Sequence, residues 1–308
     1  MVSTRHPSDV LTLFYILFKI LSINYKLCYN KLTEITTKGR SDMKYKLGAI
    51  GFGNMGGAIV SGAVRNGICS PADIAVFDLS QDKQVLCKDA GYALLGSARQ
   101  VFESAEMVLF AVKPQGMEAL LAELEGTTAA PAIISIVAGY PSAKIRAALP
   151  GAHVVRVMPN TPLLLGCGAT ALAACEGTAE GELNAALEIF AGLGETCIIT
   201  EEKMNEIIAV NGSSPAFVYY FIESIARWGE SVGLDYDDCL RLCAKTFEGS
   251  AKMILQGDVP PAELIRRVCS PGGTTIAAMK VLEKEQVAQK IAAAADACTA
   301  RAIELGKM

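Results

Sequence analysis

The chain has 308 residues, of which 51% are hydrophobic and 19% are charged, so it can form about two domains with cores and is not disordered. The formal net charge of -4 gives no positive field for nucleic acid, and no run of about 18 apolar residues predicts a membrane span. Because the chain has two histidines, His6 and His153, Ser-His and Cys-His hydrolases are excluded.

The first 43 residues differ from the rest: they are rich in Lys, Tyr, Leu and Ile, and nearly free of Gly and Ala. Three interpretations are open. A signal peptide would have a poor cleavage site, and a membrane-surface helix would be flanked by lysines. The third interpretation is a non-homologous extension over residues 1–43, either disordered or not translated. We favour the third, because Met43 is followed at once by a short basic stretch and an apolar strand.

From residue 44 onward, short apolar runs alternate with longer amphipathic stretches. This alternation predicts a Rossmann-type α/β domain over residues 44–202, with a parallel sheet covered by helices on both faces. The expected strands are Leu47–Ile50, Ile74–Phe77, Tyr92–Leu94, Met107–Val112, Ile133–Val137, His153–Met158, Ala169–Ala173 and Glu195–Ile199. The expected helices run from the first glycine loop to about Arg65, over Gln81–Lys88, from Ser97 and from about Thr178.

After Thr200 the strand-like runs disappear and Ala-rich amphipathic segments follow, which predicts an all-α domain over residues 203–308. Asp235 and Ser270 stand where helix caps are expected. Because such a bundle cannot bury all its apolar faces alone, we expect a homodimer or a higher homo-oligomer. The expected helical segments are Pro215–Gly233, Asp237–Gln256 and Thr275–Leu305.

A glycine loop directly follows the first predicted strand. Its sequence is Gly51-Phe52-Gly53-Asn54-Met55-Gly56, and a helix is expected to begin within it. The first glycine allows a tight turn, the second lets the backbone approach a pyrophosphate, and the third lets the helix pack on the sheet. The N-terminus of the helix then offers N–H groups to the phosphates. The loop therefore predicts a nicotinamide dinucleotide as cofactor.

An acidic residue, Asp78, follows the second predicted strand, 27 residues after Gly51. A carboxylate at this position accepts hydrogen bonds from the ribose hydroxyls and repels a 2′-phosphate. No arginine follows among Leu79, Ser80, Gln81 and Asp82, so the expected cofactor is NADPH or NADH with a lean towards NADH, bound in part by Asp78 and Ser80. Alternatively, Asp78 or Ser80 only caps the next helix.

Two further strand ends point to the cofactor, because ligands of open α/β sheets bind at the carboxyl ends of strands. Ala111-Val112-Lys113-Pro114 is one such end, although Lys113 could equally be a solvated lysine at a helix start. Asn160 follows another strand and provides an amide for the nicotinamide side.

The ten cysteines contain no Cys-x-x-Cys pair. Cys239 and Cys243 could share a helix face, but zinc would need further ligands and histidine is scarce. We therefore expect no metal, and we interpret the cysteines as reduced thiols of a cytoplasmic protein.

In these motifs and their order, the chain resembles the pyrroline-5-carboxylate reductase family from about Lys44 to its C-terminus. The stretches that carry the resemblance are Gly51–Gly57, Ala111–Gln115, Arg156–Pro162, Gly212–Phe217, Gly249–Met253 and Val268–Thr275. The resemblance implies a Rossmann domain, a helical dimerisation domain, and reduction of 1-pyrroline-5-carboxylate to L-proline by NAD(P)H, the last step of proline biosynthesis. It further suggests that the loop before Thr275 reaches the first glycine loop from the partner chain.

The substrate of that reaction is a small cyclic imine with a carboxylate, and the second glycine loop suits it. In Ser270-Pro271-Gly272-Gly273-Thr274-Thr275 the glycines expose backbone N–H groups at an expected helix start, which favours an anion. We expect Ser270, Gly272, Gly273, Thr274 and Thr275 to bind substrate. The hydroxyl of Thr275 is the catalytic candidate, as a hydrogen-bond partner of the ring nitrogen. The alternative is a plain helix cap.

The chain departs from the family pattern at two places. Leu264-Ile265-Arg266-Arg267 stands where many members carry an acid, and Asn211 stands where serine is common. The competing enzyme class is a β-hydroxyacid dehydrogenase, which uses a lysine with an asparagine four residues later. Lys245 and Lys252 are its candidates, but Gly249 and Gln256 follow them. The remaining alternative is a dinucleotide sensor without turnover.

Overall fold

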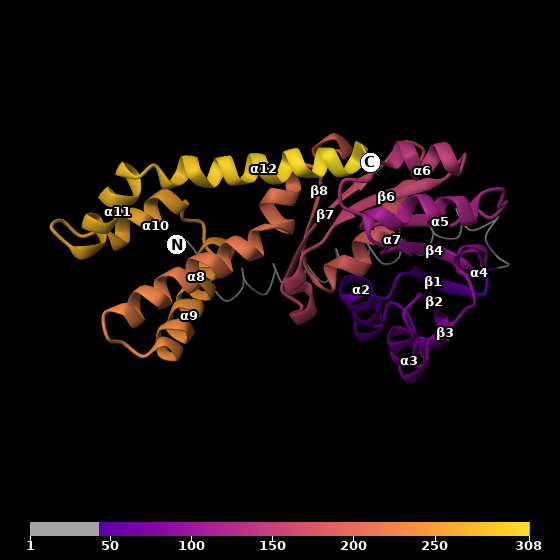
Figure 1. Ribbon diagram of the computed structural model, residues 1–308, viewed down its shortest axis with the longest axis horizontal. Helices are drawn as coiled ribbons and strands as arrows, with labels where there is room; N and C mark the ends of the chain where they lie inside the picture. Colours follow the sequence, from indigo (N-terminus) through magenta and orange to yellow (C-terminus); the bar gives the residue numbers. More distant parts are fainter. Residues whose placement is uncertain (1–42, 308) are drawn as a thin grey trace, which may run out of the picture.

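The computed structural model describes residues 43–307, which form a sheet domain followed by an elongated set of helices (Figure 1). The predicted N-terminal extension therefore lies outside the described residues, apart from Met43. The sheet has eight strands in the order β3-β2-β1-β4-β5-β6-β7-β8. The strands are β1 (Tyr45–Ile50), β2 (Ile74–Phe77), β3 (Ala93–Leu94), β4 (Ala105–Phe110), β5 (Ala132–Ser135), β6 (His153–Met158), β7 (Gly168–Ala174) and β8 (Gly194–Ile198).

Helices cover both faces of the sheet, as the alternating pattern predicted. One face carries α2 (Asn54–Arg65), α3 (Gln81–Asp89) and α7 (Glu180–Ala191); the other carries α4 (Ala98–Ser104), α5 (Met117–Leu124) and α6 (Ser142–Ala148). Strand β4 shows why: Val108 and Phe110 are buried in one core, and Leu109 between them is buried in the other. A strand buried on both faces reads as a continuous apolar run.

The sheet is parallel except between β6 and β7, which pair antiparallel with Met158 opposite Ala171. A parallel crossover needs a dozen or more residues. Between β6 and β7 the chain makes only the short turn of helix η3 (Thr161–Leu165), so it returns in the opposite direction. This reversal was not part of the sequence prediction. It places the loop after β6 next to the start of β7.

The helical part comprises the π-helical turn η5 (Ile208–Gly212), α8 (Ser214–Ser231), α9 (Tyr236–Leu255), α10 (Pro261–Val268), α11 (Thr274–Lys284) and α12 (Val287–Lys307). Two predicted segments, α8 and α9, are confirmed within two residues at each end. The predicted cap Asp235 is also confirmed, since its side chain accepts a hydrogen bond from the N–H of Asp238 at 2.9 Å.

In the last third of the chain two predictions are wrong and one helix was missed. The segment Thr275–Leu305 is two helices, because the chain turns at Gln286, where φ is 54°. Ser270 does not cap the next helix; the N-cap of α11 is Gly273, and Ser270 lies in the preceding turn. Helix α10 was not predicted at all, although Pro260 and Pro261 mark its start.

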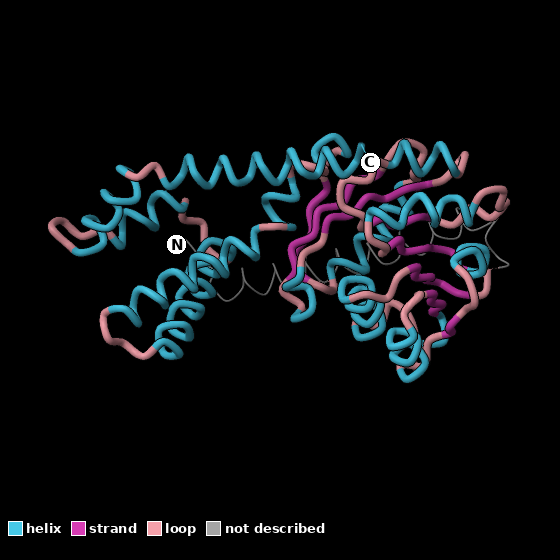
Figure 2. The backbone as a smooth tube through the Cα atoms, in the orientation of Figure 1, coloured by secondary structure: helices cyan, strands magenta, loops and turns pink. Residues whose placement is uncertain are grey.

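Helix α12 runs back along the helical part to the sheet domain, where its C-terminus lies beside α6 (Figures 1 and 2). It meets the loop after β5 at two glycines. A Cβ on Gly139 would lie 2.5 Å from the carbonyl oxygen of Ala302, and a Cβ on Gly306 would overlap the carbonyl oxygen of Gly139. The two backbones are therefore in direct contact, which only glycine permits at both positions.

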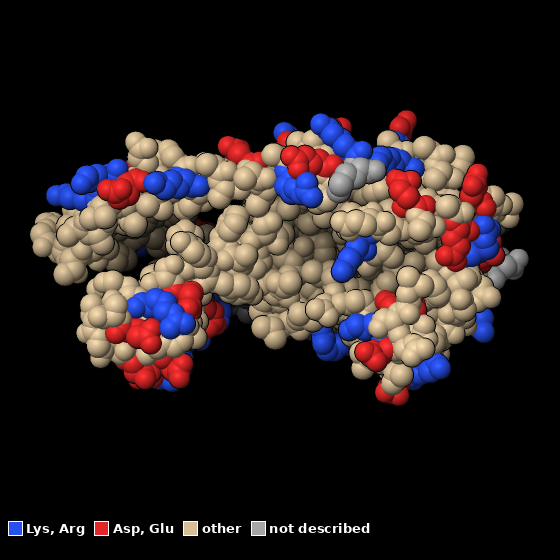
Figure 3. Space-filling view, in the orientation of Figure 1, with Lys and Arg blue, Asp and Glu red and all other residues tan. Residues whose placement is uncertain are grey.

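The helical part leaves most of its apolar side chains exposed in the single chain. Among the described residues of α8 to α12, only Ala226, Gly229 and Ala302 are buried, whereas Tyr220 and Trp228 are 71% and 64% exposed. Figure 3 shows uncharged side chains across the middle of this face, between the helical part and the sheet domain. No described helix has the length and hydropathy to span a membrane. An exposed apolar surface of this extent is typical of an interface between subunits.

Candidate functional site

The first glycine loop connects β1 to α2 at the edge where the carboxyl ends of the parallel strands meet. Gly51 has a φ of 96°, and a Cβ there would lie 2.6 Å from the carbonyl oxygen of Ala111 at the end of β4. A Cβ on Gly56 would lie 2.9 Å from the Cβ of Ala111 and overlap the carbonyl oxygen of Gly51. The fold itself therefore requires these two glycines.

Gly53 is different, because a Cβ at this position would meet no protein atom within 4 Å. It is the N-cap of the twelve-residue helix α2, which has no side-chain cap and no acidic residue in its first turn. The N–H groups of Asn54, Met55 and Gly56 thus begin the helix at its positive end. Close approach of an anion to the backbone explains a glycine that protein packing does not require. The loop fits a pyrophosphate.

The carboxylate of Asp78 holds this loop from the side. Its Oδ2 accepts a hydrogen bond from the N–H of Phe52 at 2.5 Å, and its Oδ1 accepts one from the N–H of Ser80 at 2.8 Å. The hydroxyl of Ser80, the N-cap residue of α3, makes no capping bond. Asp78 therefore joins the end of β2 to the glycine loop, and each oxygen keeps one lone-pair direction for a further donor. The N–H of Phe52 is already used, and its ring packs edge-on against Tyr92 at 5.8 Å.

The stretch after β4 lies against the same loop. The N–H of Ala111 donates to the carbonyl oxygen of Ile50 at 2.9 Å, which continues the pairing of β1 and β4 beyond the strands. Strand β4 ends at Phe110, two residues earlier than predicted. Lys113 is exposed at the start of the turn η2 (Pro114–Gly116) and makes no ion pair with any residue of the described range. Its ammonium group is thus available at this edge.

Asn160, at the carboxyl end of β6, is buried, and its Oδ1 accepts a hydrogen bond from the N–H of Ala169 at 2.9 Å. A second buried amide lies beside it. The Nδ2 of Asn211 donates to the carbonyl oxygens of Met158 at 2.6 Å and Ala169 at 2.9 Å. The sequence marked Asn211 only as a departure from a family pattern and gave no role for it. The one feature of the sequence that could have indicated a buried role for Asn211 is its carboxamide directly after a run of apolar residues.

A partly buried charged cluster, also absent from the sequence prediction, lies where the sheet meets the helical part. Glu201 accepts hydrogen bonds from the N–H and the hydroxyl of Ser142, at 2.9 and 2.7 Å, and lies 3.5 Å from the guanidinium of Arg156. Burial alone would raise the pKa of Glu201, but the bonds from Ser142, with Cys175 and Arg156, lower it. Burial also raises the pKa of the neighbouring Cys175 thiol to about 11. The cluster fixes the first residues after the sheet.

The second glycine loop begins helix α11. Gly272 has a φ of 71°, and the N–H of Gly273 donates to the carbonyl oxygen of Ser270 at 3.0 Å. Gly273 is the N-cap of α11, with no side-chain cap and no acid in the first turn, so Thr274 and Thr275 stand at its positive end. A Cβ on Gly273 would overlap the hydroxyl of Ser270. The geometry fits a small carboxylate.

Within one chain the two glycine loops lie far apart. Figure 1 shows the connection between α10 and α11 at the outer end of the helical part, whereas the first loop lies between β1 and α2 in the sheet domain. The roles predicted for the residues of both loops stay predictions. A site that uses both loops requires a second chain.

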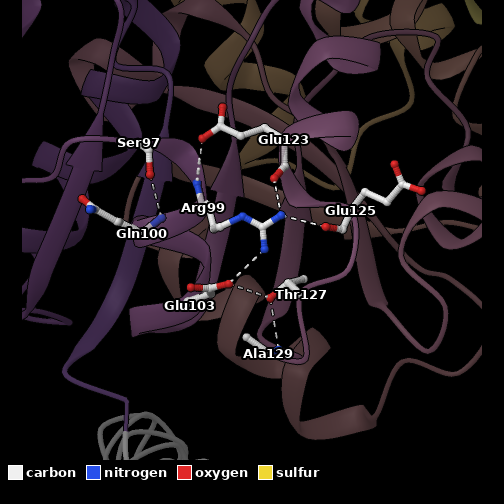
Figure 4. Close-up of polar contacts among 8 residues, drawn as sticks. All are labelled: Ser97, Arg99, Gln100, Glu103, Glu123, Glu125, Thr127 and Ala129. Atoms are coloured by element: carbon white, nitrogen blue, oxygen red, sulfur yellow. Dashed lines mark hydrogen bonds and ion pairs between the residues drawn. The ribbon is translucent and has the colours of Figure 1, made fainter.

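A further polar cluster lies between α4 and α5, towards the amino ends of the strands (Figure 4). Arg99 donates to the carbonyl oxygens of Glu123 at 2.6 Å and Glu125 at 2.7 Å, which closes the C-terminus of α5. The hydroxyl of Ser97 accepts from the N–H of Gln100 at 3.1 Å, so Ser97 begins α4 as predicted. This cluster has a structural role. Among residues 43–307 no group of three or more His, Cys, Asp or Glu side chains is arranged to hold a metal.

Two family models match the chain. One, described as pyrroline-5-carboxylate reductase dimerisation, covers residues 201–305, and the other, described as NADP oxidoreductase, coenzyme F420-dependent, covers residues 46–139. The pyrroline-5-carboxylate reductase of Escherichia coli is 36% identical over 273 residues, which are 86% of this chain and 100% of that protein. The one from Synechocystis is 35% identical over 266 residues, again 86% and 100%.

Solved structures give the same result. The pyrroline-5-carboxylate reductase of Coxiella burnetii superposes with a TM-score of 0.78 at 32% identity, over 86% of this chain and 100% of that one. The pyrroline carboxylate reductase of Plasmodium falciparum, solved with NADP bound, also has a TM-score of 0.78, at 27% identity, over 86% and 99%. Both the sheet domain and the helical part are therefore shared with these proteins.

Proposed function

The chain belongs to the pyrroline-5-carboxylate reductase family, and from this premise we propose that it reduces 1-pyrroline-5-carboxylate to L-proline with NAD(P)H, as an oxidoreductase acting on a CH–NH group. The observation that carries the proposal is a match over the full length of the curated relatives that includes both glycine loops. Each loop begins a helix that no side chain caps. One loop suits a dinucleotide and the other suits a small carboxylate.

The coenzyme supplies the hydride when it is bound. The N–H groups of Asn54, Met55 and Gly56 bind its pyrophosphate, with Gly51 and Gly53 giving access and Phe52 holding the loop to Asp78. Ala111-Val112-Lys113-Pro114 and Asn160 border the nicotinamide end. Asn160 follows β6, three strands from β1, or about 14 Å at the usual strand spacing. That span suits an extended dinucleotide lying along the strand ends.

The coenzyme preference rests on Asp78 and Ser80. The carboxylate is fixed by two backbone N–H groups at the end of β2, where the adenine ribose of a dinucleotide lies. A 2′-phosphate would have to approach this fixed negative charge, so NADH is the better coenzyme. The NADP-bound relative from Plasmodium falciparum marks NADPH as the competitor. The ratio of kcat/KM for NADH to kcat/KM for NADPH measures this preference. A strong preference for NADPH would contradict the role of Asp78.

The substrate site is the second glycine loop. The N–H groups of the turn from Ser270 to Thr274, with Gly272 and Gly273 exposing the backbone, bind the carboxylate. Thr275 hydrogen-bonds the ring nitrogen. The protonated imine accepts the hydride at carbon, the electron pair of the C=N bond moves to nitrogen, and a secondary amine results. The chain therefore has to position the substrate and exclude water, and it needs no covalent nucleophile.

The working unit is a homodimer or a larger homo-oligomer. The helical domain over residues 203–308 forms the contact between the chains, and residues 44–202 form the dinucleotide-binding domain. The exposed apolar faces of α8 to α12 support this arrangement. The partner chain brings its second glycine loop to the strand ends of the first chain. A cytoplasmic location agrees with the cysteines of the described range, all of which are free thiols.

The decisive experiment follows NADH and NADPH oxidation by the purified protein with 1-pyrroline-5-carboxylate, and L-proline formation in the same samples. Oxidation of 3-hydroxyisobutyrate is the control for a β-hydroxyacid dehydrogenase. Nothing favours that alternative, because its candidates Lys245 and Lys252 both pair with Glu248 on the exposed surface of α9. Dinucleotide binding without turnover of the imine would instead identify a sensor.

A further inference from the structure

The amides of Asn160 and Asn211 meet at one residue, Ala169, where the antiparallel pairing of β6 and β7 ends. The last paired residues are Met158 and Ala171, and the same register, continued two residues further, brings Asn160 opposite Ala169. At this pair a side chain replaces the main chain, because the N–H of Ala169 donates to Oδ1 of Asn160. The carbonyl oxygen of Ala169 then accepts from Nδ2 of Asn211.

These contacts fix which way each amide faces. A backbone N–H is a donor only, so the atom of Asn160 that faces Ala169 is the oxygen and its NH2 group points elsewhere. That NH2 group makes no hydrogen bond within residues 43–307, yet it is not among the fully enclosed unpaired polar atoms. It is therefore a donor with access to solvent at the carboxyl end of β6.

Asn211 holds this arrangement with both of its donors. Its NH2 group bridges the carbonyl oxygens of Met158 and Ala169, the residue that donates to Asn160. Its Oδ1 is enclosed and has no hydrogen-bond partner among the described residues. A serine has a single O–H donor and could satisfy only one of the two carbonyls. An asparagine at this position satisfies both carbonyl oxygens, although its own Oδ1 is left without a hydrogen-bond partner among the described residues.

We propose that Asn211 is a positioning residue for ligand binding: through Ala169 it fixes the Asn160 amide so that the NH2 group donates to an oxygen of the bound ligand. This inference rests on the proposed function. The shared chemistry of the ligand is a carbonyl or carboxylate oxygen at the strand ends, either the carboxamide oxygen of the nicotinamide or the carboxylate of the imine substrate.

The test compares Asn211→Ser, Asn160→Ala and the double variant with the wild-type protein. The dissociation constant of NADH is measured by its fluorescence without substrate, and KM is measured for 1-pyrroline-5-carboxylate. We expect Asn211→Ser to weaken one of these by about five-fold, the equivalent of one hydrogen bond. It should add less than about two-fold to the effect of Asn160→Ala, because coupled residues are not additive. A change in the NADH constant identifies the carboxamide, and a change in KM alone identifies the substrate carboxylate.

Two further variants separate positioning from general stability. Asn66→Ser removes a hydrogen bond from an Asn Nδ2 to the carbonyl oxygen of Gly192, away from the strand ends, and should change only the melting temperature. Asn160→Asp keeps the acceptor for Ala169 and removes the donor, so it should weaken the same ligand by about ten-fold or more, whatever the burial of its carboxylate costs in melting temperature. It also decides the case if Asn211→Ser does not fold.

Wild-type constants in Asn211→Ser or in Asn160→Asp, or full additivity in the double variant, overturn the inference. Absence of imine reduction by the wild-type protein would overturn the proposed function instead, and the NADH titration would still judge the role of Asn211.

Discussion

At the scale of single residues, the glycines of the first loop separate what the fold needs from what the ligand needs. Gly51 and Gly56 are confined by the backbone and side chain of neighbouring residues, whereas Gly53 has free space around it. A sequence motif treats the three positions alike. The structure assigns each a different physical constraint, and substitutions can therefore distinguish them.

We expect Gly53→Ala to keep the stability of the wild-type protein and to weaken NADH binding by about ten-fold or more, since a methyl group would stand between the backbone and the pyrophosphate. Gly56→Ala should instead lower the melting temperature, because its Cβ overlaps the carbonyl oxygen of Gly51. Fluorescence titration and thermal unfolding measure the two effects. Equal loss of stability in both variants would contradict the distinction.

Thr275 stands in the first turn of α11, beside the proposed carboxylate site. Thr275→Ala should lower kcat/KM for 1-pyrroline-5-carboxylate by about ten-fold, because a hydrogen bond to the ring nitrogen is lost in the transition state. NADH binding and the melting temperature should stay near the wild-type values. Unchanged kinetics would remove Thr275 from the mechanism.

At the scale of elements, local signals predicted well and distant contacts did not. Strands such as Ile74–Phe77 and the glycine loop were predictable because their patterns lie within a few residues. The antiparallel return of β7 and the break at Gln286 depend on which surfaces meet in three dimensions. The bond from Asn211 to Met158 spans 53 residues, and the bond from Ser142 to Glu201 spans 59, so no window of sequence contains either pair.

The contact between α12 and the loop after β5 yields a matched pair of substitutions. Gly139 and Gly151 have similar positive φ values, 73° and 83°, but a Cβ on Gly151 would meet nothing within 4 Å. Both alanine variants carry the same backbone strain, and only Gly139→Ala also pushes away Ala302. We expect a clearly larger fall in melting temperature for Gly139→Ala. Equal falls would mean that α12 does not need this contact.

The partly buried cluster at Glu201 makes the stability of the folded chain depend on pH. Burial opposes the charged carboxylate, but the bonds from Ser142 bring its pKa below the ordinary 4.5. A carboxyl group with a lowered pKa stabilises the folded state above its unfolded pKa, and this contribution is lost as the pH falls through the folded pKa. Below pH 4.5 the free energy of unfolding of the wild-type protein should therefore fall as Glu201 is protonated. Glu201→Gln has no carboxylate at this position, so it should not show this part of the fall.

Urea unfolding at several values between pH 3 and pH 7 would measure this difference. The matched control is Glu195→Gln, which changes an exposed carboxylate of β8 that has no hydrogen bond or ion pair in the described part of the chain. Glu201→Gln should also be less stable near pH 7, because the guanidinium of Arg156 stays buried without its counter-charge. Parallel pH profiles for wild type and Glu201→Gln would contradict the role of the cluster.

At the scale of the whole molecule, the distance between the two glycine loops predicts a site shared between chains. In a Gly53→Asp chain the first glycine loop should no longer bind the dinucleotide, and in a Thr275→Ala chain the substrate loop should lose its catalytic hydroxyl. In a mixed dimer one site carries both defects and the other carries neither. Co-expression of the two variants should therefore restore about a quarter of wild-type activity with random pairing. No recovery above the two separate variants would place both loops of a site in one chain.

The length of helix α12 sets the distance between the second glycine loop and the sheet domain of the same chain. The helix starts beside the second glycine loop's helix and ends against Gly139, and its 21 residues span about 31 Å. One inserted residue would lengthen it by about 1.5 Å and rotate Gly306 by about 100°, away from the one surface that accepts it. Insertions and deletions within α12 should therefore be selected against, and gaps between related sequences should fall in the turns on either side of it.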